Sequence, residues 1–396
     1  FMRTLTPRFK PNYNWKEWLA AFSFWRNERD LYESEFAQKF GCSHGVMFSY
    51  GRSALMALFD IWNLKDTEII CPAYTCVVVS NAIVLSKNKP VFVDCEKNSF
   101  HMDYEALESK ISENTSAIIV THLFGGAMDV RKIDRIIRKA EEKFNSKIYV
   151  IQDVAHSYGS SFNNELVTTF GDAAIFGCNI SKIINSIFGG FVVTNSIQAY
   201  DKLKLYQSNK LVKPNWFKEL QRLLYLIFAT IAFNKYFYFW INLLVKNGFL
   251  DRFTKYYEDD NIYLPTDWNE SPKNIEARVG RVQLKKYDKI ILERRNIAKN
   301  IIEFFENDDR VDIKPFDENN TYSHIVAIVE NRDDWILKFH KKGIELGSII
   351  DYSVPEMKAY KKYLNNLSDF PVSSFYRSHI VNFPISENFF KMIKND

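Results

Sequence analysis

The sequence predicts an α/β protein with a large three-layer α/β/α domain, a mostly parallel sheet, and a smaller C-terminal α+β domain. Short apolar runs alternate with helical segments through the first half of the chain, which is typical of parallel strands covered by helices on both faces. The hydrophobic share of 46% indicates a globular chain rather than a disordered one. The length of 396 residues allows more than one domain.

We expect three parts along the chain. Residues 1–30 form an N-terminal arm, in which Trp15 to Trp25 carry aromatic residues at helical spacing. Residues 31–262 form the large domain, with an apolar helical insertion at about 214–257. Residues 263–396 form the small domain.

The elements of the large domain are predicted from the spacing of apolar residues and from the residues that end helices and form turns. An amphipathic helix at 31–40 ends at Gly41. A short apolar strand at 46–48 leads through a Gly/Ser turn into a helix that runs to Trp62. The further predicted strands are 68–71, 89–94, 117–121, 148–151 and 173–176, and the further predicted helices are 103–111 and 133–144.

The small domain is predicted by the same signals. The motif NIEARVG, which begins at Asn274, opens one helix, and residues 287–305 form a long second helix. A strand at 325–329 precedes a helix at 334–342 that ends at Gly343. The helix after Ser386 is expected to be short.

Charge and cysteine content narrow the class of protein. The net charge of +4 is too small to indicate nucleic-acid binding. The five cysteines are odd in number and form no CxxC pair, which predicts reduced thiols in a cytosolic protein. No signal peptide is expected at the start, because FMRTLTPRFK lacks an apolar core.

Two residues in the stretch 148–195 indicate the chemistry. Asp153 ends the apolar strand, and Lys182 follows the run 173–176. Ligand-binding groups of an α/β sheet gather at the carboxyl ends of its strands. An acid and a lysine there suit a bound pyridine aldehyde, because the carboxylate keeps the ring nitrogen protonated and the lysine forms a Schiff base.

Each of the two residues alone has a plainer interpretation. An Asp at a strand end more often caps a turn or helix, and a lysine more often lies on the solvated surface. The joint spacing with other small and polar residues favours a site, and these are His156, Gly159, Gly171-Asp172, Ser181 and Gly189-Gly190.

The segment GRSAL, which begins at Gly51, is a candidate phosphate site. It lies where a strand feeds a helix, and free N–H groups and the helix dipole both attract an anion there. Small residues at a helix start are more often a simple cap.

At these residues the sequence resembles the DegT/DnrJ/EryC1/StrS family of sugar aminotransferases, which bind pyridoxal phosphate on a fold-type-I scaffold. The resemblance extends from about Leu31 to Ser386 and breaks down from about Ala199 to Ile262. It implies amino transfer, usually from glutamate, to a keto-sugar, and a homodimer whose active sites draw on both subunits. Lys182 would be the Schiff-base and proton-transfer residue, and Asp153 would protonate the ring.

The resemblance also implies cofactor-binding residues in the first half of the chain. Gly51, Arg52 and Ser53 map to phosphate contacts, mainly through backbone groups. Tyr74 is the nearest aromatic residue to the position that stacks on the pyridine ring, although Cys76 occupies the place where an aromatic residue is common. His122 opens the loop HLFG, which lies near the substrate in the family; a hydrogen-bonded loop histidine is about equally expected.

Three further cofactor contacts are implied. His156 would contact the cofactor hydroxyl. Gly177 stands where a phosphate-binding Ser is usual, and Asn179 is expected to replace that contact. Asn269, eight residues before Ala277, would reach the phosphate in the other subunit. No metal site is expected.

The segment 216–257 is unusually apolar. Residues 223–233 are apolar except for Thr230, and residues 236–245 are apolar except for Asn242. One helix over 223–245 would be about long enough to span a bilayer. A span would separate Lys182 from the C-terminal domain, so we expect an interfacial helix or a helical hairpin that enters one leaflet.

Basic residues flank this apolar segment and favour an anionic membrane surface; they are Lys202, Lys204, Lys210, Lys213, Lys218, Arg222, Lys246, Arg252 and Lys255. Thr230, Asn234, Tyr238 and Asn242 would form a polar stripe on a continuous helix. The alternative is that the segment packs against the partner subunit.

The sequence therefore predicts a cytoplasmic aminotransferase, peripherally bound at the inner face of the membrane, in bacterial surface-glycan or aminosugar biosynthesis. Its substrate would be a nucleotide- or lipid-linked keto-sugar. Two alternatives stay open. One is a pyridoxal-phosphate-dependent deoxysugar dehydratase, although relatives of that kind replace the lysine with His. The other is a cofactor-holding protein that assembles a membrane complex without turnover.

Overall fold

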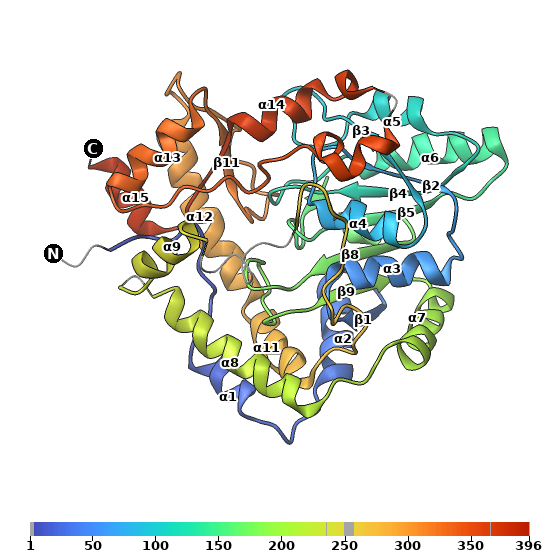
Figure 1. The fold of residues 1–396 in the computed structure, drawn as a ribbon, viewed down its shortest axis with the longest axis horizontal. Coiled ribbons are helices and arrows are strands. Elements are labelled where there is room, and N and C mark those ends of the chain that lie inside the picture. Colours follow the sequence, from blue (N-terminus) through green and yellow to red (C-terminus); the bar gives the residue numbers. More distant parts are fainter. Residues whose placement is uncertain (1–3, 235, 249–256, 365, 396) are drawn as a thin grey trace.

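The main sheet has seven strands in the order β1-β9-β8-β5-β4-β2-β3 (Figure 1). The computed structural model describes residues 4–234, 236–248, 257–364 and 366–395. Strands β8, β5, β4, β2 and β3 are parallel, whereas β9 runs antiparallel to β8 and β1. The strands are β1 (His44–Phe48), β2 (Glu68–Pro72), β3 (Lys89–Val93), β4 (Thr115–Thr121), β5 (Tyr149–Asp153), β8 (Ala173–Gly177) and β9 (Gly190–Thr194). The predicted mostly parallel sheet is confirmed.

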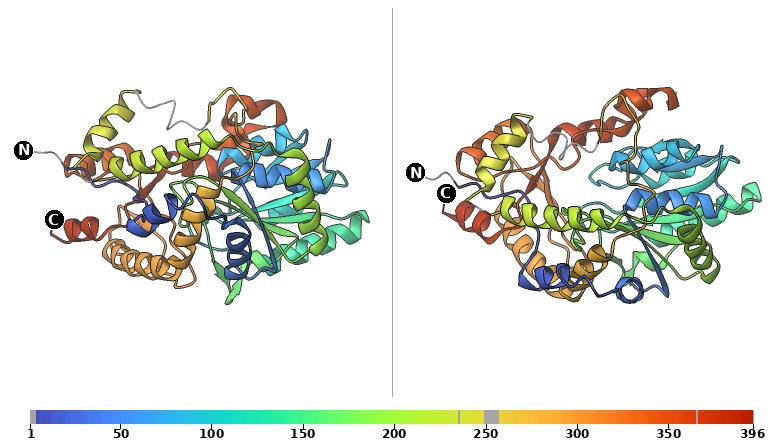
Figure 2. Two further views of the ribbon diagram at one scale, coloured as in Figure 1. Left: turned by 90° about the horizontal axis from the view of Figure 1, so that it is seen from below. Right: turned by 60° about the horizontal axis from the view of Figure 1, so that its bottom comes forward.

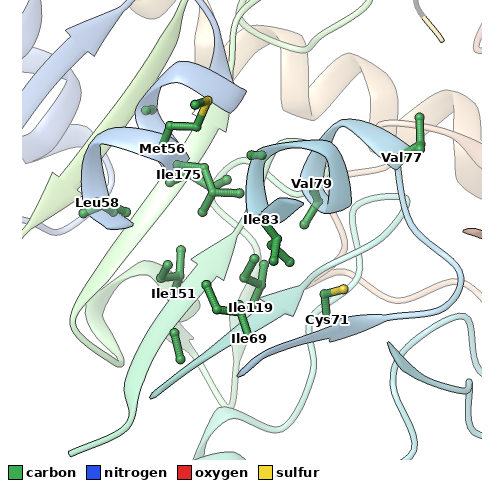
Figure 3. Packing of buried hydrophobic residues seen from close by; sticks show 14 of the residues in the cluster. Met56, Leu58, Ile69, Cys71, Val77, Val79, Ile83, Ile119, Ile151 and Ile175 are labelled. Atoms are coloured by element: carbon green, nitrogen blue, oxygen red, sulfur yellow. The ribbon is translucent and has the colours of Figure 1, made fainter. Parts of the chain in front are cut away.

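Alternate residues of each strand face opposite layers, as the two-residue period of a strand requires. Ile69, Ile119 and Ile151 pack in the cluster that contains α3 (Gly51–Ile61), α4 (Val77–Leu85) and α7 (Ile197–Lys210) (Figure 3). Their neighbours Ile118 and Val150 pack on the other side, with α5 (Tyr104–Lys110) and α6 (Val130–Phe144). Helices therefore cover both faces of the sheet, which makes the expected three layers.

The helices begin and end where capping residues predict. The helix α2 (Arg29–Lys39) is followed by Gly41 at φ +74°, a conformation that glycine adopts without steric cost. Asp103 caps α5 through the N–H of Ala106, and Asn145 ends α6 in the left-handed region. Helices α11 (Asn274–Lys285) and α12 (Tyr287–Phe305) follow the predicted ranges.

A second, antiparallel sheet has the order β10-β11-β12. It contains β10 (Asp312–Ile313), β11 (Ile325–Ile328) and β12 (Ile380–Phe383), and the helices nearby are α13 (Arg332–Lys341), α14 (Pro371–His379) and α15 (Glu387–Lys394). In Figures 1 and 2 the second sheet, with α13 and α15, lies at the opposite end from α5 and α6. Helix α14 instead begins beside the main sheet, where the Val372 N–H donates to Asp94 after β3.

The hydrophobic core changes within α12. Ile290 and Ile291 pack with the main sheet, whereas Ala298 to Phe305 pack with the second sheet. The expected boundaries at residues 30 and 262 stay a prediction. All five cysteines are free thiols.

The apolar segment forms two helices, α8 (Trp216–Ala232) and α9 (Tyr238–Lys246), which we call the α8–α9 segment. A continuous helix over 223–245 is therefore wrong, and with it the stripe on one helix. Tyr238 and Asn242 instead hydrogen-bond Glu345 at 2.5 and 3.1 Å. Among the helices of the described residues, none has the length and hydropathy that crossing a bilayer requires.

Several of the basic flanking residues form ion pairs within the chain. Lys204 pairs with Glu33 and Lys210 with Asp60. Lys218 and Arg222 pair with acids beneath α8, because α8 packs on the chain through the face that carries them. Arg252, Lys255 and the side chain of Lys246 lie outside the described part of the chain.

The packing of α11 on α2 depends on Gly280. A Cβ at this position would lie 2.5–2.7 Å from the Tyr32 ring and hydroxyl, and Tyr32 is fully buried between Phe36 and Phe191. We expect Gly280→Ala to lower the free energy of unfolding by roughly 1–3 kcal/mol, although alanine gains about 1 kcal/mol in helix propensity. Denaturant unfolding measures this.

The matched control is Gly126→Ala, whose new Cβ would meet its nearest atom at 3.4 Å. Equal stability changes in the two variants would contradict the packing argument.

Candidate active site

The site lies at the carboxyl ends of neighbouring parallel strands. Asp153 is the last residue of β5 and pairs in register with Thr121 of β4 and Ile175 of β8. Lys182 follows β8 in the loop that leads to β9. The topology therefore brings the predicted acid and the predicted lysine to one edge of the sheet.

Burial sets the electrostatics of Asp153. The residue is 4% exposed, and its Oδ1 accepts the N–H of Ala155 at 3.0 Å. Burial raises the pKa of the carboxyl, while the Ala155 N–H and Lys182 oppose that rise. A buried carboxylate of this kind gains stability from a cationic partner.

A tight turn holds Lys182. Its N–H donates to the carbonyl of Asn179 at 3.0 Å, and the Asn179 side chain accepts both the N–H and the hydroxyl of Ser181. Removal from water lowers the pKa of the half-buried Lys182, while Cys76, Asp153 and Cys178 oppose this. The amine is therefore more often uncharged, and more nucleophilic, than an exposed lysine.

The first turn of α3 lies against the same strand end. A Cβ on Gly51 would lie 3.0 Å from the Phe176 carbonyl and 3.3 Å from the Cα of Gly177. A Cβ on Gly177 would lie 3.8 Å from Cε of Lys182. The N-terminus of α3 and the lysine are thus neighbours, as the predicted phosphate site requires.

The N–H groups of this turn are available to an anion. Tyr50, the N-cap, makes no side-chain capping bond among the described residues. The Ser53 hydroxyl donates to the Trp268 carbonyl at 2.6 Å. The group of Ser53 that can donate to an anion is therefore its backbone N–H. The Arg52 guanidinium lies 5.9 Å from the Tyr50 ring.

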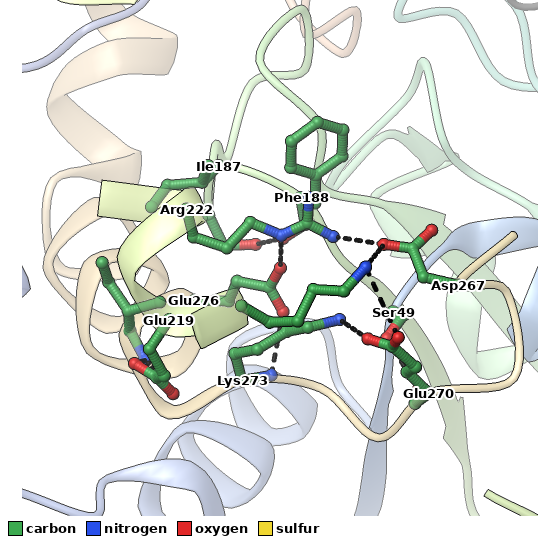
Figure 4. Close-up of polar contacts among 12 residues, drawn as sticks. Ser49, Ile187, Phe188, Glu219, Arg222, Asp267, Glu270, Lys273 and Glu276 are labelled. Carbon is green, nitrogen blue, oxygen red and sulfur yellow. Dashed lines mark hydrogen bonds and ion pairs between the residues drawn. The ribbon is translucent and has the colours of Figure 1, made fainter. Parts of the chain in front are cut away.

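A network of charged residues around Arg222 (Figure 4) contacts the first turn of α3 through Tyr50. The Tyr50 hydroxyl donates to Asp267 at 2.7 Å, and Asp267 pairs with Arg222 of α8 at 3.0 Å. Arg222 also pairs with Glu276 at 2.9 Å and lies over the Phe188 ring. The Tyr50 hydrogen bond and then Arg222 lower the pKa of Asp267, although burial opposes them.

This network was not predicted from the sequence. Arg222 was expected at a membrane flank, whereas its side chain is 11% exposed. The partners of Arg222 lie 45 and 54 residues away in the sequence, so no local pattern marks them.

Two histidines form another wall of the site, of which His156 is buried and His324 is partly buried. The rings of His156 and His324 are 5.2 Å apart, and Phe124 lies beside both. Burial and then Lys182 lower the pKa of each well below its usual value. Nδ1 of His156 has no hydrogen-bond partner among the described residues. His324, which directly precedes β11, was not predicted as a site residue from the sequence.

Three residues that were expected to contact the cofactor make hydrogen bonds within the chain. Tyr74 is fully buried and donates to the Ile350 carbonyl. The backbone carbonyl and the side-chain oxygen of Asn179 accept hydrogen bonds within the turn that holds Lys182. Asn269 lies in the loop over α3, and its carbonyl accepts the Val212 N–H. Ring stacking, the Asn179 phosphate contact and the reach of Asn269 into a second subunit stay predictions.

His122 is a loop histidine whose two ring nitrogens both have hydrogen-bond partners within the protein. It is fully buried, Nδ1 accepts the Met128 N–H at 3.0 Å, and Nε2 lies 2.8 Å from the Gln152 side-chain oxygen. Both ring nitrogens are therefore occupied in the neutral form.

The residues present fit a phosphorylated pyridine aldehyde. An anion-attracting helix start, a buried carboxylate, a lysine of lowered pKa and the unpartnered Nδ1 of His156 surround one strand edge. These groups match, in kind, the phosphate, the ring nitrogen, the aldehyde and the ring hydroxyl of such a molecule.

Comparison with known proteins gives a family match. The model of the DegT/DnrJ/EryC1/StrS aminotransferase family matches residues 21–234 and 241–391. The expected departure over 199–262 is therefore corrected, since 235–240 alone within that stretch are unmatched. The whole of α8 and residues 241–246 of α9 lie within the matched ranges. The apolar insertion itself stays a prediction.

Similar proteins include transaminases and a dehydratase. The chain is 31% identical to GDP-perosamine synthase of Escherichia coli O157:H7 over 46% of this chain and 49% of that protein. It is 25% identical to dTDP-3-amino-3,6-dideoxy-alpha-D-galactopyranose transaminase of Aneurinibacillus thermoaerophilus over 91% of this chain and 85% of that protein. The matches span 49–61% of the length of several other curated relatives.

The fold is similar to that of a solved GDP-4-keto-6-deoxy-D-mannose-3-dehydratase of E. coli with bound hydrated pyridoxal phosphate. The TM-score is 0.76 at 20% identity, over 99% of this chain and 98% of that chain. This likeness concerns the fold alone.

Buried neutral histidines make the stability of the protein sensitive to acid. Burial lowers the pKa of His122 to about 4, whereas the unfolded chain titrates near pH 6.5. The unfolded state therefore binds the proton first, and stability is lost as pH falls from 6.5 to 4. We expect His122 to account for a loss of roughly 2 kcal/mol between pH 7 and pH 5.

The measurement is denaturant unfolding at both pH values for the wild type and His122→Asn, which removes the titration. The variant should lose less stability on acidification. The same pH dependence in both proteins would show that His122 is not the group involved.

Proposed function

The chain belongs to the DegT/DnrJ/EryC1/StrS aminotransferase family, and we propose that it is a pyridoxal-phosphate-dependent enzyme that moves an amino group to a keto-sugar. The observation that carries the proposal is the convergence of Asp153, Lys182 and the first turn of α3 at one strand edge. The cofactor and the reaction need these three groups together.

The residues have separate tasks. When bound, pyridoxal phosphate supplies a conjugated ring that accepts the electron pair left when the substrate carbon loses its proton. The N–H groups of Gly51, Arg52 and Ser53 hold the phosphate at the helix start. Asp153 holds a proton on the ring nitrogen, and that positive charge stabilises the buried carboxylate.

Lys182 attaches the cofactor and then serves as the base. Burial lowers the pKa of Lys182 and so favours the uncharged Nζ relative to an exposed lysine. The uncharged Nζ can take a proton from the substrate carbon and return it. His156 Nδ1, buried without a partner among the described residues, is placed to bind the cofactor hydroxyl. The buried surroundings exclude water from the proton transfers.

The names of the relatives indicate the substrate class. GDP-perosamine synthase and the dTDP-sugar transaminase are named for amino sugars on nucleotide carriers. We propose a keto-sugar on a diphosphate carrier as the acceptor and glutamate as the amino donor. We also propose a homodimer, in which Asn269 reaches the cofactor of the other subunit.

A dehydratase is the second candidate, because a fold neighbour has that name. Lys182 favours transamination, since the retained amine can both hold the cofactor and return a proton. A protein that only holds the cofactor would still use Lys182 for attachment, but it would show no half-reaction with an amino donor.

The test is the visible absorption of protein loaded with pyridoxal phosphate, before and after addition of glutamate. We expect conversion to pyridoxamine phosphate in the wild type. In Lys182→Ala the rate should fall by a factor on the order of 10² to 10⁴ or more, because general base catalysis is lost.

Lys202→Ala, an exposed lysine on α7, is the control and should convert at the wild-type rate. Full activity of Lys182→Ala would refute the assigned role. A loaded wild type that ignores glutamate would favour the dehydratase.

We propose further that the enzyme is cytoplasmic and binds the inner membrane face through the α8–α9 segment. Large apolar residues on both helices are exposed, among them Phe228 (52%), Phe237 (55%) and Trp240 (62%). Aromatic residues of this kind favour the interface of a bilayer. The support is apolar rather than ionic, because several flanking cations are paired within the chain.

The membrane proposal is tested by flotation with vesicles of phosphatidylcholine and phosphatidylglycerol. We expect the Phe228→Glu, Trp240→Glu double variant to lose binding, because each charge must leave the apolar interface. Leu292→Glu, at a 61% exposed site on α12, is the matched control.

Unchanged flotation of the double variant would exclude this surface. Loss of a dimer in sedimentation, with flotation retained, would show instead that the α8–α9 segment packs against a second subunit.

A further inference from the structure

A cationic cavity of about 360 Å³ opens beside Lys182. Its lining comes from the N-terminal segment, from Ser181, from the connection between α8 and α9, from α12 and from the start of α15. Arg8, Lys10 and Arg294 contribute positive charge, and none of the lining residues is acidic. The function proposed above uses none of these three cations.

The three cations are available to a ligand. Among the described residues, none of them forms an ion pair with a carboxylate at 4.0 Å or less. Arg294 is fixed by bonds from Nη1 to the carbonyls of Tyr322 and Ser323, at 3.0 and 3.1 Å. Burial lowers its pKa to about 10, so it stays charged at neutral pH. The nearby acid Glu345 already binds the Arg8 N–H, Tyr238 and Asn242.

The cavity is continuous with the active site. Ser181, the neighbour of Lys182, forms part of its wall. His324 forms another part and lies 5.2 Å, ring to ring, from His156. A molecule that reaches Lys182 with one end can therefore fill the cavity with the next group along.

The connection between α8 and α9 forms the remaining wall. Phe233, Asn234 and Tyr236 line the cavity, and the Phe233 ring packs on Phe9 of the N-terminal segment at 4.8 Å. Ile231 and Phe237, adjacent in sequence to this wall, are more than half exposed. Exposed apolar side chains thus flank, along the chain, the residues that line the charged cavity.

We propose that this cavity binds the diphosphate that joins the sugar to its carrier, and that the carrier is a lipid whose hydrocarbon chain lies on the α8–α9 segment. The proposal rests on the proposed function and names the carrier. Guanidinium groups bind phosphate oxygens in a forked geometry, and a diphosphate balances three cations better than one carboxylate does. An apolar, aromatic surface at the mouth suits a hydrocarbon chain more than a nucleoside.

The test compares calorimetric binding of inorganic pyrophosphate, farnesyl diphosphate and uridine diphosphate to the cofactor-loaded protein. We expect farnesyl diphosphate to bind tightest. The Arg8→Gln, Lys10→Gln double variant should weaken pyrophosphate and farnesyl diphosphate at least about tenfold, because two charge-assisted contacts are lost. Phe237→Ser should weaken farnesyl diphosphate several-fold and leave pyrophosphate unchanged.

The control is the Arg135→Gln, Lys143→Gln double variant, which removes the same charge from exposed positions of α6. Equal weakening by control and test variants would overturn the subsite. Tighter binding of uridine diphosphate than of farnesyl diphosphate would overturn the lipid carrier. Binding is measured without turnover, so failure of glutamate conversion in the wild type would refute the proposed function separately.

Discussion

The close approach of the first turn of α3 to the ends of β8 and β9 is the constraint on which the site depends. A Cβ on Gly51 would be 3.0 Å from the Phe176 carbonyl, and one on Gly190 would be 2.3 Å from the Gly51 nitrogen. Backbones can approach this closely where side chains are missing. The approach places the helix N-terminus beside the Lys182 turn, while strand register alone places Asp153 next to both. A helix N-terminus, a buried acid and a lysine thus meet at one strand edge, and these are the groups that the proposed function requires.

Buried charges hold the loop that covers this turn. Arg222, Lys218 and Lys273 face Asp267, Glu270 and Glu276, three cations against three anions. Lys273 and Glu276 are fully buried. Loss of one partner from a buried pair typically costs about 3–5 kcal/mol, because it leaves the other charge unpaired. The network thereby links α8 to Tyr50 through Asp267. One face of the α8–α9 segment is therefore held beside the candidate site, whereas apolar side chains on its other face are exposed.

The sequence was informative about features that depend on residues close together in the chain. Strands and helices followed from apolar periodicity, and Asp153 and Lys182 from the tendency of ligands to bind at strand ends. It failed where contacts join distant residues. Arg222 appeared to be a surface cation until Asp267 and Glu276 enclosed it, and His324 is a single loop histidine with no local signature. Apolar composition alone could not distinguish one helix from two, because the break between α8 and α9 contains no proline or glycine.

The most direct test of this account is chemical attachment of the cofactor. Protein loaded with pyridoxal phosphate would be reduced with borohydride, digested and mapped by peptide mass spectrometry. We expect one pyridoxyl phosphate group per chain, on Lys182. A label on another lysine with Lys182 unmodified, or no label on a chain that remains folded, would contradict the assignment of this strand edge as the active site.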